Sequence, residues 1–111
     1  MGNLTFAEFS AMNRERCHQW MGSGDTLHHH VIGLAGEVGE LCNEVKKVDR
    51  AARGVPGGKS DGDVAGEIAD VLIYLDLVAM HLDVDLEAAV VKKFNATSVK
   101  HGFLQQIPIA D

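Results

Sequence analysis

Hydrophobic residues recur every three or four positions in four segments of the chain, and no segment alternates between apolar and polar residues as a strand does. This pattern predicts an all-α domain whose helices pack antiparallel as a four-helix bundle. The predicted helices cover residues 6–20, 27–49, 64–81 and 86–100.

Residues that favour helix ends flank these segments. Thr5 and Glu8 match a capping box at the start of the first helix, and Gly102 is placed to end the fourth. The other two predicted caps leave a choice, Asp25 or Thr26 for the second helix and Asp83 or Asp85 for the fourth.

The remaining segments read as connections within one domain that spans residues 1–111. Residues 50–63 contain four glycines and a proline and are predicted to form a flexible loop, and residues 104–111 are predicted to form a tail. The stretch VLIYLDLVAM in the third segment is apolar on nearly every side, so this helix is predicted to be the central, buried one.

Composition and charge exclude several classes of protein. The chain has 111 residues, 46% of them hydrophobic and 23% charged, which is typical of a globular domain. The net charge of −6 argues against a general nucleic-acid or anionic-membrane binder. Neither a signal peptide nor an apolar run long enough to span a membrane is apparent, and Cys17 and Cys42 are expected to be free thiols, so a cytoplasmic location is predicted.

Acidic side chains lie beside the apolar stripe on two of the predicted helices. A helical wheel places Glu37 and Glu40 together on the second helix, and Glu67 and Asp70 together on the third. The same stripes continue through Glu44 on the second helix and through Asp63, Tyr74 and His81 on the third. If the two helices pack antiparallel, the two acidic pairs meet at the edge of their interface.

Carboxylates gathered in this way repel one another unless a cation lies between them. Because they are hard oxygen ligands, the four carboxylates favour Mg²⁺, with Mn²⁺ as a second possibility. The alternative is a solvated acidic face, which any amphipathic helix can present. Gly33, Gly36 and Gly39, which lie on different faces of the second helix, are predicted to allow neighbouring backbones to approach closely.

The segments GLAGEVGEL and GEIADVLIYL together resemble the E-x-x-E and E-x-x-D motifs of the MazG-like nucleoside triphosphate pyrophosphohydrolases, closest to the dCTP pyrophosphatase-like branch. The resemblance spans residues 27–103, with KKFN as a third matching element, although Gly36 stands where many branches have glutamate. It implies an all-α fold that assembles as a homodimer or a dimer of dimers. It also implies Mg²⁺-dependent hydrolysis of an NTP or dNTP to the monophosphate and pyrophosphate.

By position, the resemblance makes Glu37, Glu40, Glu67 and Asp70 the Mg²⁺ ligands. Asn95 and Tyr74 match residues that contact the nucleotide.

Chemical reasoning adds further candidates. Hydrolysis requires a positioned water and a base, and Glu40 is the carboxylate that we assign to activate that water. Trp20 is a candidate to stack on a base, with a packing role as the alternative. Lys92, Lys93 and Lys100 are candidates to contact phosphate, with solvated helix lysines as the alternative.

Two other functions remain open at this stage. The chain could be a non-catalytic helical dimerisation module whose acidic stripes are only surface. A di-iron carboxylate bundle ranks last, because neither motif has a histidine at its fourth position. The run His28–His30 is expected to lie in a partly exposed first helical turn, and its spacing from the cysteines does not match a structural zinc site.

Overall fold

The computed structural model describes residues 2–109, and within them it contains four α-helices, one short 3₁₀ turn and no strand. The all-α prediction is confirmed, and each helix begins at the residue that the pattern predicts or within one residue of it. The elements are α1 (Phe6–Met21), the 3₁₀ turn η1 (Gly22–Gly24), α2 (Leu27–Ala52), α3 (Val64–His81) and α4 (Leu86–His101).

The helix ends are fixed by the capping residues that the sequence offers. The hydroxyl of Thr5 accepts a hydrogen bond from the Glu8 amide at 3.1 Å, and Thr26, not Asp25, caps α2 in the same way. Asp85, not Asp83, caps α4, which ends at Gly102 in the left-handed conformation with φ 74°.

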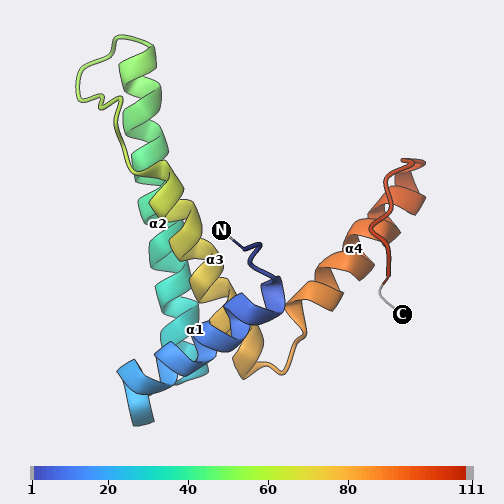
Figure 1. The fold of residues 1–111 in the computed structure, drawn as a ribbon. Helices are drawn as coiled ribbons and strands as arrows, with labels where there is room; N and C mark the ends of the chain where they lie inside the picture. Colours follow the sequence, from blue (N-terminus) through green and yellow to red (C-terminus); the bar gives the residue numbers. More distant parts are fainter. Residues whose placement is uncertain (1, 110–111) are drawn as a thin grey trace.

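Helices α2 and α3 form an antiparallel hairpin that contains most of the packing within the chain (Figure 1). The connection between them is shorter than predicted, because the first residues of the 50–63 segment prolong α2 to Ala52. The rest folds back along α2, where the Lys59 amide donates to the Lys47 carbonyl at 3.0 Å. Gly33 explains how closely the helices approach, because a Cβ at this position would collide with the Tyr74 ring. A Cβ at Gly36 or Gly39 would meet nothing within 4 Å, so the predicted close approach holds only at Gly33.

Helix α1 crosses α3 and is held there by a buried polar network. The Asn13 amide donates to the Ile73 carbonyl and to the Asp76 carboxylate, both at 3.0 Å. Ser10 donates to the other oxygen of Asp76 at 2.9 Å. Asn13 and Asp76 are buried, so these bonds satisfy groups that would otherwise be costly inside the protein.

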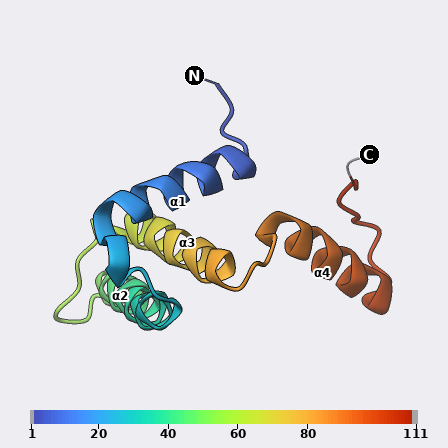
Figure 2. The ribbon, with the colours of Figure 1, turned by 90° about the horizontal axis from the view of Figure 1, so that it is seen from below.

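Helix α4 extends away from the other three helices, so a single chain does not close into a compact bundle (Figures 1 and 2). The radius of gyration is 17.4 Å, whereas a compact domain of this length has about 13 Å. The accessible surface is 8260 Å², against about 6,000 Å² for a compact monomer of this mass.

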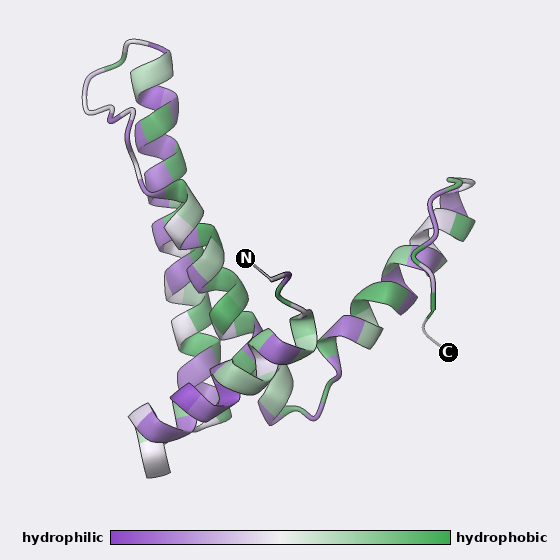
Figure 3. Cartoon of the chain, viewed as in Figure 1, coloured by the Kyte–Doolittle hydropathy of each residue, from purple (hydrophilic) through white to green (hydrophobic). Residues whose placement is uncertain are grey.

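Much of the apolar stripe that was predicted to form the core is open to solvent in the single chain. Helix α3 does contact both α1 and α2 and buries Leu77 and Ala79, as its central position predicts. Its first half, however, contains no fully buried residue and exposes Ile68 and Leu72. Hydrophobic positions spread along α3 and recur along α4 (Figure 3). The large apolar side chains that are exposed on the hairpin are Val31, Ile32, Val38, Val45, Ile68, Leu72 and Leu75.

The C-terminal segment is pinned to α4 by one side chain. Asn95 donates to the Ile107 carbonyl at 2.9 Å and accepts from the Ile107 amide at 2.7 Å. Part of the predicted tail is therefore ordered against the helix, while Ala110 and Asp111 lie outside the described residues. Across residues 2–109, no helix has the length and apolar character needed to cross a membrane.

The network between α1 and α3 yields a stability prediction. Asn13→Ala removes two hydrogen bonds and leaves a buried carbonyl and carboxylate short of donors, which is expected to cost about 1–3 kcal/mol of unfolding free energy. Thermal unfolding followed by circular dichroism measures the loss. Gln19→Ala, an exposed amide on the same helix, is the control, and equal destabilisation by both changes would contradict the assigned role of Asn13.

Candidate functional site

The α2–α3 hairpin brings three of the four predicted carboxylates together. Each of Glu37, Glu67 and Asp70 has an oxygen within 4.8 Å of an oxygen of the other two. Because α2 and α3 run antiparallel, side chains three residues apart on α3 face the matching turn of α2. The predicted meeting of the acidic pairs at the edge of the helix interface is therefore observed for these three residues.

Glu40 lies at the outer side of this cluster. Its side chain is exposed, but it is close enough for its charge to raise the pKa of both Glu37 and Glu67. Two other members of the predicted stripes have structural roles instead. Glu44 pairs with Lys47 at 3.1 Å, and Asp63 caps α3 by accepting from the Gly66 amide at 3.0 Å.

The three clustered carboxylates strongly disfavour being charged together. Burial, followed by the charges of Glu40, Glu37 and Asp70, raises the pKa of Glu67 from 4.5 to about 7. Burial and the charges of Glu40 and Asp70 also raise the pKa of Glu37. Within residues 2–109, no lysine, arginine or histidine forms an ion pair with any of these four acids.

Two oxygens of the cluster lack the partners that buried polar atoms normally have. The Oε2 atoms of Glu37 and Glu67 are buried and form no hydrogen bond with the described part of the chain. A cation placed among the carboxylates would satisfy both atoms and remove the repulsion. The donor set consists only of carboxylate oxygens, so the residues present fit Mg²⁺ or Mn²⁺.

Tyr74 and Trp20 lie beside one small cavity near this end of the hairpin. Tyr74 packs its ring against Gly33, one turn from Asp70, and Trp20 occupies the last turn of α1 with 78% of its surface exposed. The exposure leaves the indole free to stack on a planar ligand. In the single chain Trp20 is not packed in the core, which was the alternative role.

The candidate residues on α4 lie away from the carboxylates within one chain. Lys92, Lys93 and Lys100 are exposed on the helix that extends from the rest of the molecule (Figures 1 and 2). The amide of Asn95 is occupied by the backbone of Ile107. In the single chain, the candidate residues of α4 and the carboxylates therefore do not come together.

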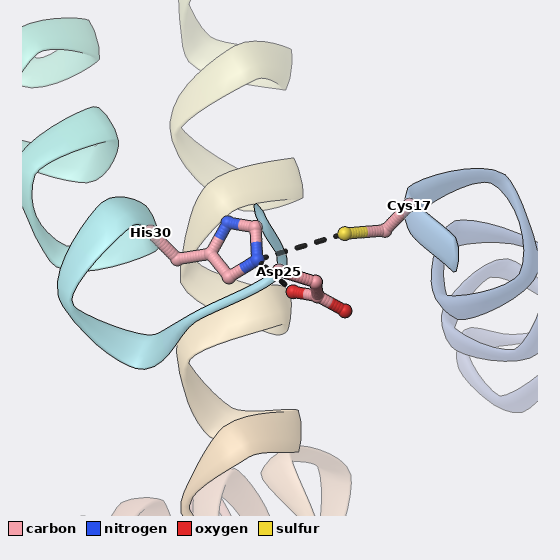
Figure 4. Close-up of side chains that lie close together, drawn as sticks. All are labelled: Cys17, Asp25 and His30. Carbon is pink, nitrogen blue, oxygen red and sulfur yellow. Dashed lines mark hydrogen bonds and ion pairs between the residues drawn. The ribbon is translucent and has the colours of Figure 1, made fainter. Parts of the chain in front are cut away.

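The structure contains a second polar cluster, which includes a cysteine and a histidine whose spacing in the sequence argues against a structural zinc site. Cys17 of α1, Asp25 of the connection before α2, and His30 of α2 converge, as Figure 4 shows. His81 of α3 joins them through a 2.7 Å contact between its Nε2 atom and Oδ1 of Asp25. His30 is fully buried, contrary to the expectation of a partly exposed turn, which holds for His28 and His29.

Hydrogen bonds hold this second cluster together. Those from His81 and His30 lower the pKa of Asp25 to about 2, and burial together with the nearby Asp25 charge raises the pKa of the Cys17 thiol to about 11. Neither Cys17 nor Cys42 is in a disulfide, as predicted. The sequence contained only one hint of this cluster, the placement of His81 on the polar side of the third helix.

The raised pKa of Glu67 predicts that the stability of the protein falls as the pH rises toward neutral. The pKa of Glu67 is higher in the folded chain than in the unfolded chain. Between the two pKa values, the folded chain keeps a proton that the unfolded chain releases. Chelator-treated protein is therefore expected to lose thermal stability as pH rises from about 5 through about 7. Melting temperatures across this range measure the effect. Glu67→Gln should flatten the profile and the exposed Glu15→Gln should not; a wild-type profile that rises with pH would contradict the assignment.

Comparison with known proteins identifies a relative from a phage. No family model matches the chain, and no solved structure matches it. The chain is 35% identical over 79 residues to the Gene 37 protein of Mycobacterium phage L5, and the match covers 67% of this chain and 69% of the relative. It therefore belongs to the same family as the Gene 37 protein of Mycobacterium phage L5.

Proposed function

We propose that this protein is a Mg²⁺-dependent nucleoside triphosphate pyrophosphohydrolase, which releases pyrophosphate and a nucleoside monophosphate. The observation that supports the proposal most is the gathering of Glu37, Glu67 and Asp70 on two helices, with two buried oxygens left without partners. The resemblance of both motifs to the MazG-like enzymes connects this acidic cluster with triphosphate substrates.

The acidic residues explain how a protein of net charge −6 would hold a polyanion. Mg²⁺ bound at the cluster would neutralise phosphate oxygens and lower the pKa of a water molecule. Glu37, Glu67 and Asp70 would hold the ion. Glu40, which is exposed at the edge of the cluster, would orient the attacking water and accept its proton.

The complete site is proposed to form in a homodimer. The hairpin exposes Val38 and Val45 at an interval of seven residues on α2, and Ile68, Leu72 and Leu75 at intervals of four and three on α3. This is the pattern of two helices from a four-helix core, and a second hairpin would complete it. The surface in excess of a compact monomer is about 2,000 Å² per chain, which falls in the range of obligate dimer interfaces.

The assembly also provides a role for α4. A helix that leaves its own hairpin is available to reach the hairpin of the partner, where Lys92, Lys93 and Lys100 would supply the positive charge that the carboxylate cluster lacks. Asn95 and Tyr74 would then act as the nucleotide contacts that the resemblance implies. We keep Trp20 as a candidate to stack on the base, and its exposure supports this role.

A non-catalytic helical dimerisation module is the second candidate. The exposed apolar stripe on α2 and α3 favours self-association whether or not a reaction takes place. The two functions differ in one measurable respect, because only the enzyme releases pyrophosphate.

Activity is tested with a panel of NTPs and dNTPs in the presence of Mg²⁺ or Mn²⁺. Pyrophosphate release is expected from at least one nucleotide, and Glu40→Gln or Glu67→Gln is expected to reduce kcat/KM by about 100-fold or more. Glu15→Gln, an exposed acid on α1, serves as the control and should retain activity. Release of orthophosphate alone, or no turnover of any nucleotide, would reject the enzyme and favour the dimerisation module.

The oligomeric state is tested separately by light scattering coupled to size-exclusion chromatography. The wild type is expected to have at least twice the 12.0 kDa mass of one chain. The double change Val38→Glu and Leu72→Glu is expected to dissociate it, because two charges would enter the apolar interface. Val55→Glu, at an exposed valine in the connection between α2 and α3, is the control and should leave the mass unchanged. A well-folded wild-type monomer would rule out the proposed assembly.

A further inference from the structure

The cluster of Cys17, Asp25, His30 and His81 has no part in the proposed hydrolysis. Metal-binding atoms of Cys17, Asp25 and His30 all lie within 4.8 Å of one another, and His81 joins them through its contact with Asp25. The Nε2 atoms of His30 and His81 lie 2.5 and 2.7 Å from Oδ1 of Asp25. The Cys17 sulfur lies 3.5 Å from Nε2 of His30 (Figure 4). The four ligands come from α1, the connection before α2, α2 itself and α3.

We propose that these four side chains bind Zn²⁺ and thereby fasten α1 and the following turn to the α2–α3 hairpin. One thiol, two imidazoles and one carboxylate make a four-coordinate set of the ligand types that Zn²⁺ takes in proteins. The sulfur excludes Mg²⁺, so the two clusters select different metals. Its ligands are separate from the carboxylates of the proposed function, because His30 precedes Glu37 by seven residues, about 10 Å along the helix axis. Cys17 and His30 do line the same small cavity as Trp20 and Tyr74.

The donor atoms of Cys17, Asp25 and His30 lie within reach of one tetrahedral ion, and His81, which contacts Asp25, would complete the set by moving toward it. Bonds of about 2.0 Å to nitrogen and about 2.3 Å to sulfur place a cysteine sulfur and a histidine nitrogen about 3.5 Å apart. The contact between Cys17 and His30 already has this length. The two contacts of Asp25 are shorter because they are hydrogen bonds, and they need to open by less than about 1 Å. Asp25 precedes the cap of α2 and lies outside both helices, so it is the ligand best placed to move.

Hydrogen bonds within the cluster leave room for a metal. Asp25 accepts from both histidines and from the Cys17 thiol, and Nε2 of His30 carries at most one proton, so it cannot also donate to the sulfur. The buried thiol becomes a strong ligand once a metal displaces its proton. The side chain of His81 is 22% exposed, which gives an ion a route into the cluster.

The unsupported Nδ1 atom of His30 lowers the expected affinity of this cluster for Zn²⁺. A histidine that binds a metal through Nε2 carries its proton on Nδ1, and Nδ1 of His30 is buried without a hydrogen-bond partner among residues 2–109. A missing acceptor at this position typically costs 10- to 100-fold in affinity. Binding is therefore expected to be weaker than in sites whose histidines are fully supported.

The test uses the full chain, prepared reduced and metal-free, and titrated with Co²⁺ and then with Zn²⁺ in excess Mg²⁺ to fill the carboxylate cluster. The expected result is one tetrahedral Co²⁺ per chain, with a sulfur-to-cobalt charge-transfer band that Zn²⁺ abolishes. Cys17→Ser should remove this band and Cys42→Ser, at the exposed free cysteine, should keep it. Zn²⁺ should also raise the melting temperature of the wild type.

A second pair of variants keeps the test valid if Cys17→Ser fails to fold. His81→Gln replaces a partly exposed ligand and is expected to weaken Zn²⁺ binding at least 10-fold, while His101→Gln on the exposed end of α4 should not. Circular dichroism of the metal-free variants confirms that each is folded. Absence of a tetrahedral Co²⁺ spectrum in the wild type, or equal spectra from Cys17→Ser and Cys42→Ser, would overturn the proposal and leave a hydrogen-bonded network only.

Discussion

The packing of α2 against α3 is the interaction on which the rest of the structure depends. It places Glu37 beside Glu67 and Asp70, it fixes Tyr74 against Gly33, and it brings His81 of α3 to Asp25 just before α2. The same packing brings together acidic groups that repel one another. The hairpin therefore holds mutually repelling carboxylates at one edge. Several apolar side chains of α2 and α3 remain exposed to solvent.

The two polar clusters show how side-chain chemistry, and not proximity alone, determines what a site can hold. In the carboxylate cluster, burial and the charges of the neighbouring acids raise the pKa of Glu67. In the other cluster Asp25 receives hydrogen bonds from two histidines, and its pKa falls. The pKa values of two acids in the same fold, Glu67 and Asp25, are thus shifted in opposite directions by their neighbours.

The local features of the fold could be predicted from the sequence, because they depend on residues close together in the chain. The helix starts follow from Thr5, Thr26 and Asp85, and the acidic clustering follows from the three-residue spacing of Glu67 and Asp70. The features that escaped prediction depend on contacts between distant segments. Nothing in the periodicity of residues 86–100 shows that α4 leaves the hairpin, and nothing in the spacing of Cys17 and His30 shows that Asp25 and His81 meet them. An apolar stripe likewise predicts burial but not whether the covering surface belongs to the same chain.

The contact between Gly33 and Tyr74 has a consequence for the carboxylates. Gly33 lies one helical turn before Glu37, and Tyr74 lies one turn after Asp70. The contact between Gly33 and Tyr74 is therefore one turn away from the contact of Glu37 with Asp70, between the same two helices. The absence of a side chain at residue 33 therefore sets the local width of the gap across which the oxygens face each other. A methyl group there would widen that gap, and the distance between the acids would change without any alteration of the acids themselves. Gly33, which has no side chain, thus controls the spacing of Glu37, Glu67 and Asp70 from a position outside their cluster.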